Sequence, residues 1–118
     1  MATIKSHTDL SQSKKLAKIL PITSIDFAWC IFSNGSTKLL RMDDWEVSEN
    51  AKSNVEIIPC WSLAALLSVL PKINGLKPIL DLEENSLQYT GIDLYVVADN
   101  PVDACYEMII KLYELNLL

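Results

Sequence analysis

The chain is poor in the residue types that enzyme sites use most often. Its 118 residues include one histidine, three glycines and three cysteines. The glycines Gly35, Gly75 and Gly91 are scattered, which excludes a glycine-rich phosphate-binding loop. The lone His7 is a weak candidate for a triad base, because a catalytic imidazole must be held by the fold and oriented by a carboxylate. These shortages argue against an enzyme, and no cofactor is expected.

The cysteines Cys30, Cys60 and Cys105 are widely separated along the chain. An odd, scattered set predicts neither a disulfide framework nor a zinc site. A cysteine nucleophile is also disfavoured, since no second histidine is available as its base. We expect all three to be small, buried hydrophobic side chains.

Long hydrophobic runs are missing as well. No stretch approaches the roughly 20 apolar residues that a membrane-spanning helix needs, and residues 1–15 lack the apolar core of a signal peptide. We therefore expect a cytoplasmic protein without membrane contact. The length predicts a single domain over residues 1–118 with a flexible tail over residues 1–8. Because 50% of the residues are hydrophobic, we expect part of the apolar surface to remain exposed and to contact a protein partner or a second copy of the chain.

The net charge of −5 is unevenly distributed. Residues 1–41 contain six basic and two acidic residues (+4), whereas residues 42–118 contain four basic and thirteen acidic residues (−9). Residues 60–118 have the element order of a double-stranded-RNA-binding domain. A phosphate-binding surface needs lysine and arginine, so the negative charge of this half argues against nucleic acid. A nucleic-acid-linked regulator that uses Lys14, Lys15 and Lys18 of the first helix remains an alternative.

Paired carboxylates offer a different chemistry, because two acids can hold a divalent cation or share a proton. The candidate pairs are Asp43/Asp44, Glu83/Glu84 and Asp99/Asp103. The first two pairs fall in expected turns, and Asp103 suits the positive end of a helix. A small metal-dependent hydrolase is therefore kept as a further alternative, and no metal ligand is assigned.

The N-terminal third predicts a helix followed by a hairpin. Asp9 or Ser11 can cap the helix; with Asp9 at the N-cap, Gln12 takes the capping-box position, and Pro21 ends the helix. Residues 25–33 are rich in aromatic and β-branched types, as strands are. Asn34-Gly35 then predicts a two-residue type I′ turn.

Such a turn sets the strand register. It places Ile31 opposite Lys38 and Trp29 opposite Leu40. The following side chains then share one face, which we expect to be the core face: Phe27, Trp29, Ile31, Leu40 and Met42. Residues 43–54 are expected to form a polar surface loop, and residues 55–58 a short strand.

The C-terminal half contains the clearest helix signals. Within residues 59–70, Ser62 can cap a helix that Pro71 stops. Its apolar residues surround the axis, so we expect it to be buried between the sheet and either the last helix or a second subunit. Strands are expected at residues 78–82, 86–90 and 92–98. The inner stripe expected for the last helix is Val102, Cys105, Ile109, Leu112 and Tyr113.

That last helix begins with Asn100 as its cap and Pro101 in its first position, and Asn116 can end it. The element order is thus helix, two strands, a short strand, helix, three strands and helix. This order predicts the α+β class, with an antiparallel, meander-rich sheet and about three packed helices.

Three segments carry a resemblance to known sequences: residues 9–17 (DLSQSKKLA), residues 59–67 (PCWSLAALL) with Leu70-Pro71 behind them, and residues 98–109 (ADNPVDACYEMI). They resemble small proteins of gut Bacteroides-type bacteria, their phages and mobile elements. The resemblance extends over most of the chain, and relatives are expected to differ in residues 43–54. It implies an intracellular, accessory-gene setting. No activity is assigned to that family, so it adds no site residues.

The leading hypothesis is a non-enzymatic accessory protein that acts through protein–protein contacts in a phage or mobile-element setting. The expected contact surface is Trp45, Trp61, Leu115, Leu117 and Leu118. For Trp45 a structural alternative stays open, in which the ring folds onto the sheet edge.

Overall fold

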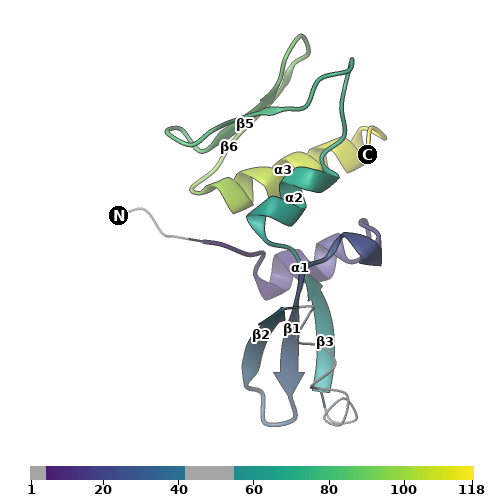
Figure 1. Ribbon diagram of the computed structural model, residues 1–118, viewed down its shortest axis with the longest axis vertical. Coiled ribbons are helices and arrows are strands. Elements are labelled where there is room, and N and C mark those ends of the chain that lie inside the picture. The colour runs from purple at the N-terminus through teal and green to yellow at the C-terminus, as the bar shows by residue number, and fades with distance from the viewer. Residues whose placement is uncertain (1–4, 42–54) are drawn as a thin grey trace.

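The structure is a computed structural model that describes residues 5–41 and 55–118, and these contain three α-helices and two three-stranded sheets (Figure 1). The elements are α1 (Leu10–Leu16), the short 3-10 helix η1 (Ile22–Ser24), β1 (Phe27–Phe32), β2 (Thr37–Arg41), β3 (Val55–Cys60), α2 (Leu63–Val69), β4 (Ile79–Asp81), β5 (Ser86–Tyr89), β6 (Leu94–Val97) and α3 (Pro101–Glu114). The predicted α+β class and element order are confirmed. The predicted single sheet is instead divided into two.

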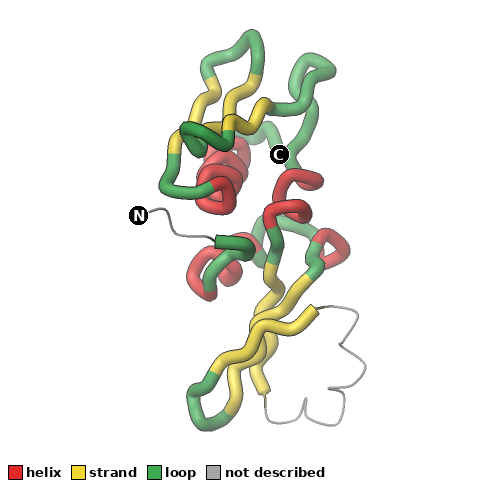
Figure 2. Tube along the Cα trace, turned by 60° about the vertical axis from the view of Figure 1, so that its left-hand side comes forward, coloured by secondary structure: helices red, strands yellow, loops and turns green. Residues whose placement is uncertain are grey.

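The two antiparallel sheets lie at opposite ends of an elongated molecule of 50 × 33 × 22 Å. The sheet with order β2-β1-β3 forms one end and the sheet with order β4-β5-β6 the other. Figure 2 shows the helices gathered between them. We call the first the lower sheet and the second the upper sheet, as they appear in Figure 1.

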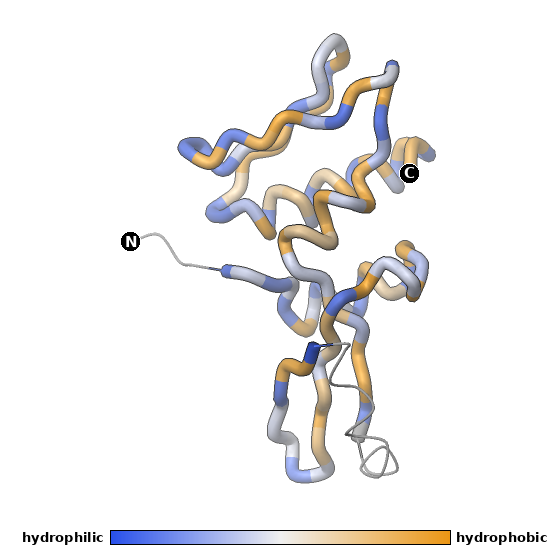
Figure 3. The backbone as a smooth tube through the Cα atoms, in the orientation of Figure 1, coloured by the Kyte–Doolittle hydropathy of each residue, from blue (hydrophilic) through white to orange (hydrophobic). Residues whose placement is uncertain are grey.

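The main hydrophobic core surrounds α3, which contacts α2, β5 and β6. The helix buries Val102, Ala104, Cys105, Met108, Ile109 and Leu112. The predicted inner stripe is therefore right except for Tyr113, which is 52% exposed because it lies beside the stripe rather than on it. Figure 3 shows apolar residues concentrated along α2 and α3.

The helix caps follow the sequence signals. Asp9 and Gln12 form the capping box, Ser62 Oγ accepts from the Ala65 amide at 3.2 Å, and Asn100 Oδ1 accepts from the Asp103 amide at 2.9 Å. These contacts satisfy amides that the first helical turn leaves unpaired.

One helix boundary, one strand boundary and one burial pattern differ from expectation. Helix α1 ends at Leu16, before Pro21. The next turn tightens into hydrogen bonds between residues three positions apart, such as Ile19 N–H to Leu16 C=O at 2.9 Å. Strand β3 runs to Cys60 instead of residue 58, and α2 begins at Leu63, as a cap at Ser62 predicts. Helix α2 packs on α3 as one expectation had it, but its opposite side, at Ala64, is exposed.

The register of the lower hairpin is shifted by one residue from the predicted one. Trp29 lies opposite Leu39, not Leu40, and Cys30 lies opposite Lys38. Since opposed residues share a face, Leu40 belongs with Ala28 and Cys30 rather than with Trp29. The predicted core face is therefore wrong: Phe27, Trp29 and Ile31 are half-buried, while Ala28 and Cys30 on the other face are buried. Met42 lies outside the described residues.

The loop at Asn34-Gly35 explains this shift, because it differs from the loop that the second Asn-Gly pair, Asn74-Gly75, forms. Gly35 has φ +85° and donates its amide to Phe32 C=O at 2.9 Å, while Asn34 is absent from the positive-φ residues. The connection is thus a three-residue loop with Gly35 in the left-handed region, not a type I′ turn. The type I′ geometry occurs at Asn74-Gly75, where both φ values are positive (54° and 78°) and Ile73 and Leu76 exchange two backbone hydrogen bonds.

Residues 5–8, expected as part of a loose tail, instead lie against the helices and the lower sheet. His7 forms an isolated antiparallel bridge with Ser62, and Ser6 C=O accepts from the Leu63 amide at 3.2 Å. Lys5 Nζ lies 2.7 Å from an Asp103 oxygen on α3. This segment therefore ties the lower part of the molecule to α2 and α3.

Candidate interaction surface

Trp61, one of the predicted surface residues, is fully buried. Its indole Nε1 donates to Ser24 Oγ at 2.9 Å, so both its ring and its polar atom are used inside the fold. Trp61 therefore cannot belong to an accessible surface. Trp45 lies outside the described residues. The remaining residues of the predicted surface are Leu115, Leu117 and Leu118.

The C-terminal leucines are exposed because the chain turns sharply after α3. Asn116 adopts φ +59°, and the Leu117 amide donates back to Leu112 C=O at 2.9 Å. This is a Schellman-type end with asparagine in the left-handed position, as the sequence indicated for Asn116. The turn leaves Leu115, Leu117 and Leu118 exposed by 52%, 44% and 42%.

Leu118 also lines an open hollow of about 420 Å³ that we call the C-terminal groove. Three parts of the chain form it: the segment after α1, the end of α2 and the end of α3. Its lining is Ile19, Leu20, Pro21, Val69, Pro71, Tyr113 and Leu118. No lining side chain carries a charge, and Tyr113 supplies the one polar atom of these side chains. Sequence reasoning missed six of these residues, because they meet only in the folded chain.

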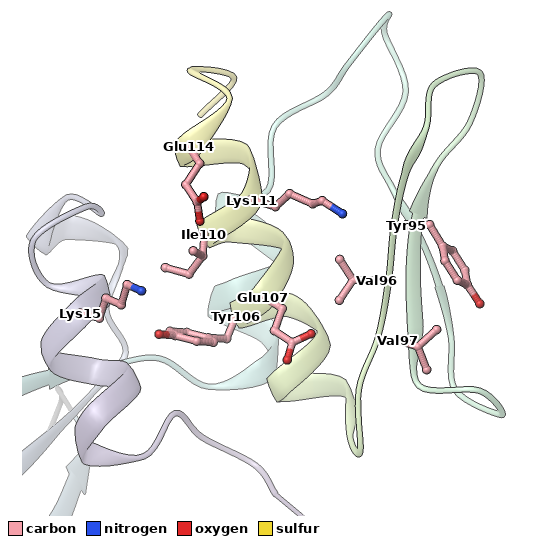
Figure 4. Close-up of a pocket in the computed structure, with 9 residues that line it drawn as sticks. All are labelled: Lys15, Tyr95, Val96, Val97, Tyr106, Glu107, Ile110, Lys111 and Glu114. Atoms are coloured by element: carbon pink, nitrogen blue, oxygen red, sulfur yellow. The ribbon is translucent and has the colours of Figure 1, made fainter.

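A second open hollow, of about 480 Å³, lies over the outer side of α3, between α1 and β6 (Figure 4). We call it the β6 groove. Its lining is Lys15, Tyr95, Val96, Val97, Tyr106, Glu107, Ile110, Lys111 and Glu114. The two lysines and two glutamates balance in charge, in contrast to the uncharged C-terminal groove.

The fold brings a serine, a histidine and a carboxylate near one another, at Ser62, His7 and Asp26. Asp26 accepts from the Ser62 amide at 2.9 Å and from Ser62 Oγ, while His7 Nδ1 pairs with Ser6 Oγ at 2.6 Å. Over residues 5–41 and 55–118, no hydrogen bond joins the imidazole to Asp26 or to Ser62. Asp26 thus stabilises Ser62, the N-cap of α2, and the three residues do not have the hydrogen-bond connectivity of a triad.

His7 is held in place by packing as well. Its ring meets Phe27 edge-on with centroids 4.1 Å apart. Burial lowers the pKa of His7 below its ordinary value, against the opposing influence of Asp26. Placed in this way, the imidazole serves as a packing group between β1 and the N-terminal segment.

The cysteines are free and buried, as predicted. Burial raises the pKa of Cys105 to about 12, so its thiol stays protonated near neutral pH. Burial also raises the pKa of Cys60, although hydrogen bonds from Thr8 and Ser13 oppose this shift. Neither group has the character of a nucleophile.

The described carboxylates of the candidate pairs are either exposed or bound to other side chains. Glu83 and Glu84 are exposed in the turn after β4, and Asp103 is bound to Lys5, Gln12 and Asn100 at 2.7–2.9 Å. Asp43 and Asp44 lie outside the described residues. Within the part of the chain that the structure describes, no three His, Cys, Asp or Glu side chains group as metal ligands do.

Comparison with known proteins gives no relative to place beside this site: no family model, curated protein sequence or solved structure matches the chain. Of the helices in the described ranges, none is long and apolar enough to cross a membrane.

Proposed function

We propose that this protein acts through protein–protein contact and that the C-terminal groove is its contact site. One observation carries the proposal: the side chains that line the groove carry no charge, and Tyr113 and Leu118 remain about half exposed at its rim. Covering such a surface releases on the order of 25 cal/mol per Å² of apolar area. The phage or mobile-element setting belongs to the same proposal and rests on the resemblance alone.

The alternative functions gain less support from the fold. Lys14 and Lys15 are exposed on α1, and Lys18 is exposed just beyond its end, but Lys15 shares the β6 groove with Glu107 and Glu114. Its positive charge is thereby locally balanced, whereas a phosphate-binding surface requires an uncompensated one.

The test compares tagged proteins in a pull-down from nuclease-treated lysate of the source organism. Leu118→Asp places a charge in the apolar groove, while Leu82→Asp places the same charge on an exposed leucine of the β4–β5 turn. We expect a stoichiometric protein partner with the wild-type chain and with Leu82→Asp, and its loss with Leu118→Asp. Retention of the partner by Leu118→Asp would move the contact away from the groove. A wild-type bait without any partner would contradict the proposal.

A further inference from the structure

The outer face of the upper sheet, which is the face turned away from α3, carries exposed apolar side chains. A solvated face of an antiparallel sheet is normally polar. The register aligns Ile79, Gln88 and Tyr95 in one row across β4, β5 and β6, and Val97 lies in the next row of the same face. Ile79, Tyr95 and Val97 are 62%, 43% and 53% exposed. Figures 1 and 2 show the described helices on the other side of this sheet, so none of them covers the outer face.

The strands of the upper sheet and their connections carry carboxylates without counterions. Residues 78–99 contain no lysine or arginine and five acidic residues, all exposed: Asp81, Glu83, Glu84, Asp93 and Asp99. Within the described ranges, the ion pairs join Lys5 to Asp9 and to Asp103, and none involves these five carboxylates. Lys77 instead places its Nζ 2.5 Å from the Leu70 C=O at the end of α2. This region thus concentrates a charge equal to the net −5 of the whole chain.

Two of these carboxylates lie on or beside the apolar side chains of the outer face. Asp81 shares a cross-strand row with Val97, and the Tyr95 hydroxyl donates to Glu84 Oε2 at 3.1 Å. The hydrogen bond to Glu84 raises the pKa of the Tyr95 hydroxyl above its ordinary value, and the charge of Asp81 acts in the same direction. Negative charge and exposed apolar area are therefore adjacent on one surface.

We propose that the outer face of the upper sheet binds a basic polypeptide segment of a partner protein, in which lysine or arginine residues are interspersed with apolar ones. The apolar side chains of the segment cover Ile79, Tyr95 and Val97, and its cations pair with Asp81 and Glu84. An apolar centre with a polar rim is the usual composition of a protein interface, and complementary charge selects the partner.

The same carboxylates disfavour other occupants of this face. Nucleic acid and anionic lipid headgroups carry phosphate, which a surface of uncompensated carboxylates repels. A second copy that docked through the same face would bring these acids against their own counterparts. A cationic segment neutralises them. This contact lies away from the C-terminal groove and does not depend on it.

The test measures the binding of labelled synthetic peptides to the full chain by fluorescence anisotropy. A peptide in which lysine alternates with valine should bind the wild-type chain, with an affinity that falls as salt rises from about 50 to about 500 mM. The matched peptide with glutamate in place of lysine should not bind. The peptide with serine in place of valine should bind about tenfold more weakly, because it has the charge without the apolar contacts.

Charge variants locate the site of binding. Asp81→Asn/Glu84→Gln removes two charges from the outer face and should weaken binding of the lysine–valine peptide about tenfold. Glu107→Gln/Glu114→Gln removes the same charge from exposed positions of α3 and should bind like the wild type. Equal weakening by the two pairs would mean that the peptide responds to net charge alone, which would overturn the proposal.

Apolar variants test the other half of the surface. Ile79→Ser/Val97→Ser should weaken binding about tenfold, whereas Ile22→Ser/Leu117→Ser, at exposed positions elsewhere, should not. Circular dichroism melting confirms that each variant is folded.

Two further outcomes would also overturn the proposal. One is a wild-type chain that does not bind the lysine–valine peptide. The other is self-association of the wild-type chain without peptide, lost in Ile79→Ser/Val97→Ser by sedimentation equilibrium, because it would assign the face to a second copy. Leu118→Asp should bind the peptide like the wild type, which separates failure here from failure of the proposed function.

Discussion

The two sheets of this protein have the same number of strands and the same antiparallel pairing, yet they are held in different ways. In the upper sheet, four side chains belong to the main core that packs around α3: Leu87, Tyr89, Leu94 and Val96. Among the described residues, the main core includes no side chain of β1, β2 or β3. The lower sheet instead buries small residues such as Ala28 and Cys30.

Hydrogen bonds around Thr8 take the place of that missing core contact. Thr8 is fully buried, its C=O accepts from Trp29 Nε1 at 2.9 Å, and its Oγ1 pairs with Ser13 Oγ at 2.7 Å. The Trp61 amide also donates to Thr8 Oγ1, at 3.2 Å. One sheet is thus anchored by apolar area and the other by directional polar contacts. The first tolerates small shifts, whereas the second depends on a few atoms.

The largest expected effect comes from the apolar anchor. Leu87→Ala removes a fully buried side chain of β5 from the main core. We expect the free energy of unfolding, measured in urea, to fall by about 2–5 kcal/mol. The exposed neighbour gives the control, since Gln88→Ala should change it by less than about 0.5 kcal/mol. Equal effects of the two substitutions would contradict apolar anchoring of the upper sheet.

The next effect comes from the polar anchor. Thr8→Val keeps the shape of the side chain but leaves the Trp61 amide and Ser13 hydroxyl without their partner. We expect a loss of about 1–3 kcal/mol. Hydrogen exchange should show the loss of protection in β1 before β5. Uniform loss in both sheets would show that Thr8 does not specifically hold the lower one. Thr37→Val, at an exposed position of β2, is the matched control.

A smaller and pH-dependent effect is expected where the N-terminal segment meets α3. Burial alone would raise the pKa of Asp103, but hydrogen bonds from Lys5, Gln12 and Asn100 hold it below its ordinary value. The carboxylate therefore stabilises the fold above its unfolded pKa of about 4, and this stability is lost as the pH falls through the lower, folded pKa.

Asp103→Asn should accordingly reduce the free energy of unfolding by about 1 kcal/mol at pH 7. It should also flatten the decline of stability below about pH 4. Urea titrations at pH 7 and pH 3 measure both quantities. An unchanged acid decline in the variant would mean that other carboxyl groups cause it.

The smallest effect distinguishes the two Asn-Gly turns. Asn74 has φ +54°, so Asn74→Ala forces alanine into the left-handed region and should lose about 1 kcal/mol. Asn34 lies outside that region. Asn34→Ala removes the Oδ1 atom that accepts an exposed hydrogen bond of 2.9 Å from the Ser36 amide. We expect about 0.5 kcal/mol there. The reverse order in thermal melts would contradict the turn assignment.

The sequence determined the local features of this protein. Asp9 with Gln12, Ser62 and Asn100 form the caps that their spacing predicted, because a cap depends on residues three positions apart. A strand was also expected over residues 92–98, and β6 occupies residues 94–97 of it. Helix and strand order followed from the same short-range signals.

Tertiary structure alone decided the rest. The hairpin loop at Asn34-Gly35 is one residue longer than the loop that the same dipeptide forms at Asn74-Gly75, and that difference moves Leu40 from the face of Trp29 to the face of Ala28. Local chemistry allows both loops. The burial of Trp61 and the joining of Ile19, Val69 and Leu118 into one groove depend on contacts between residues far apart in the chain. Hydrophobic burial is non-directional, so the pattern of apolar residues does not reveal which of them will meet.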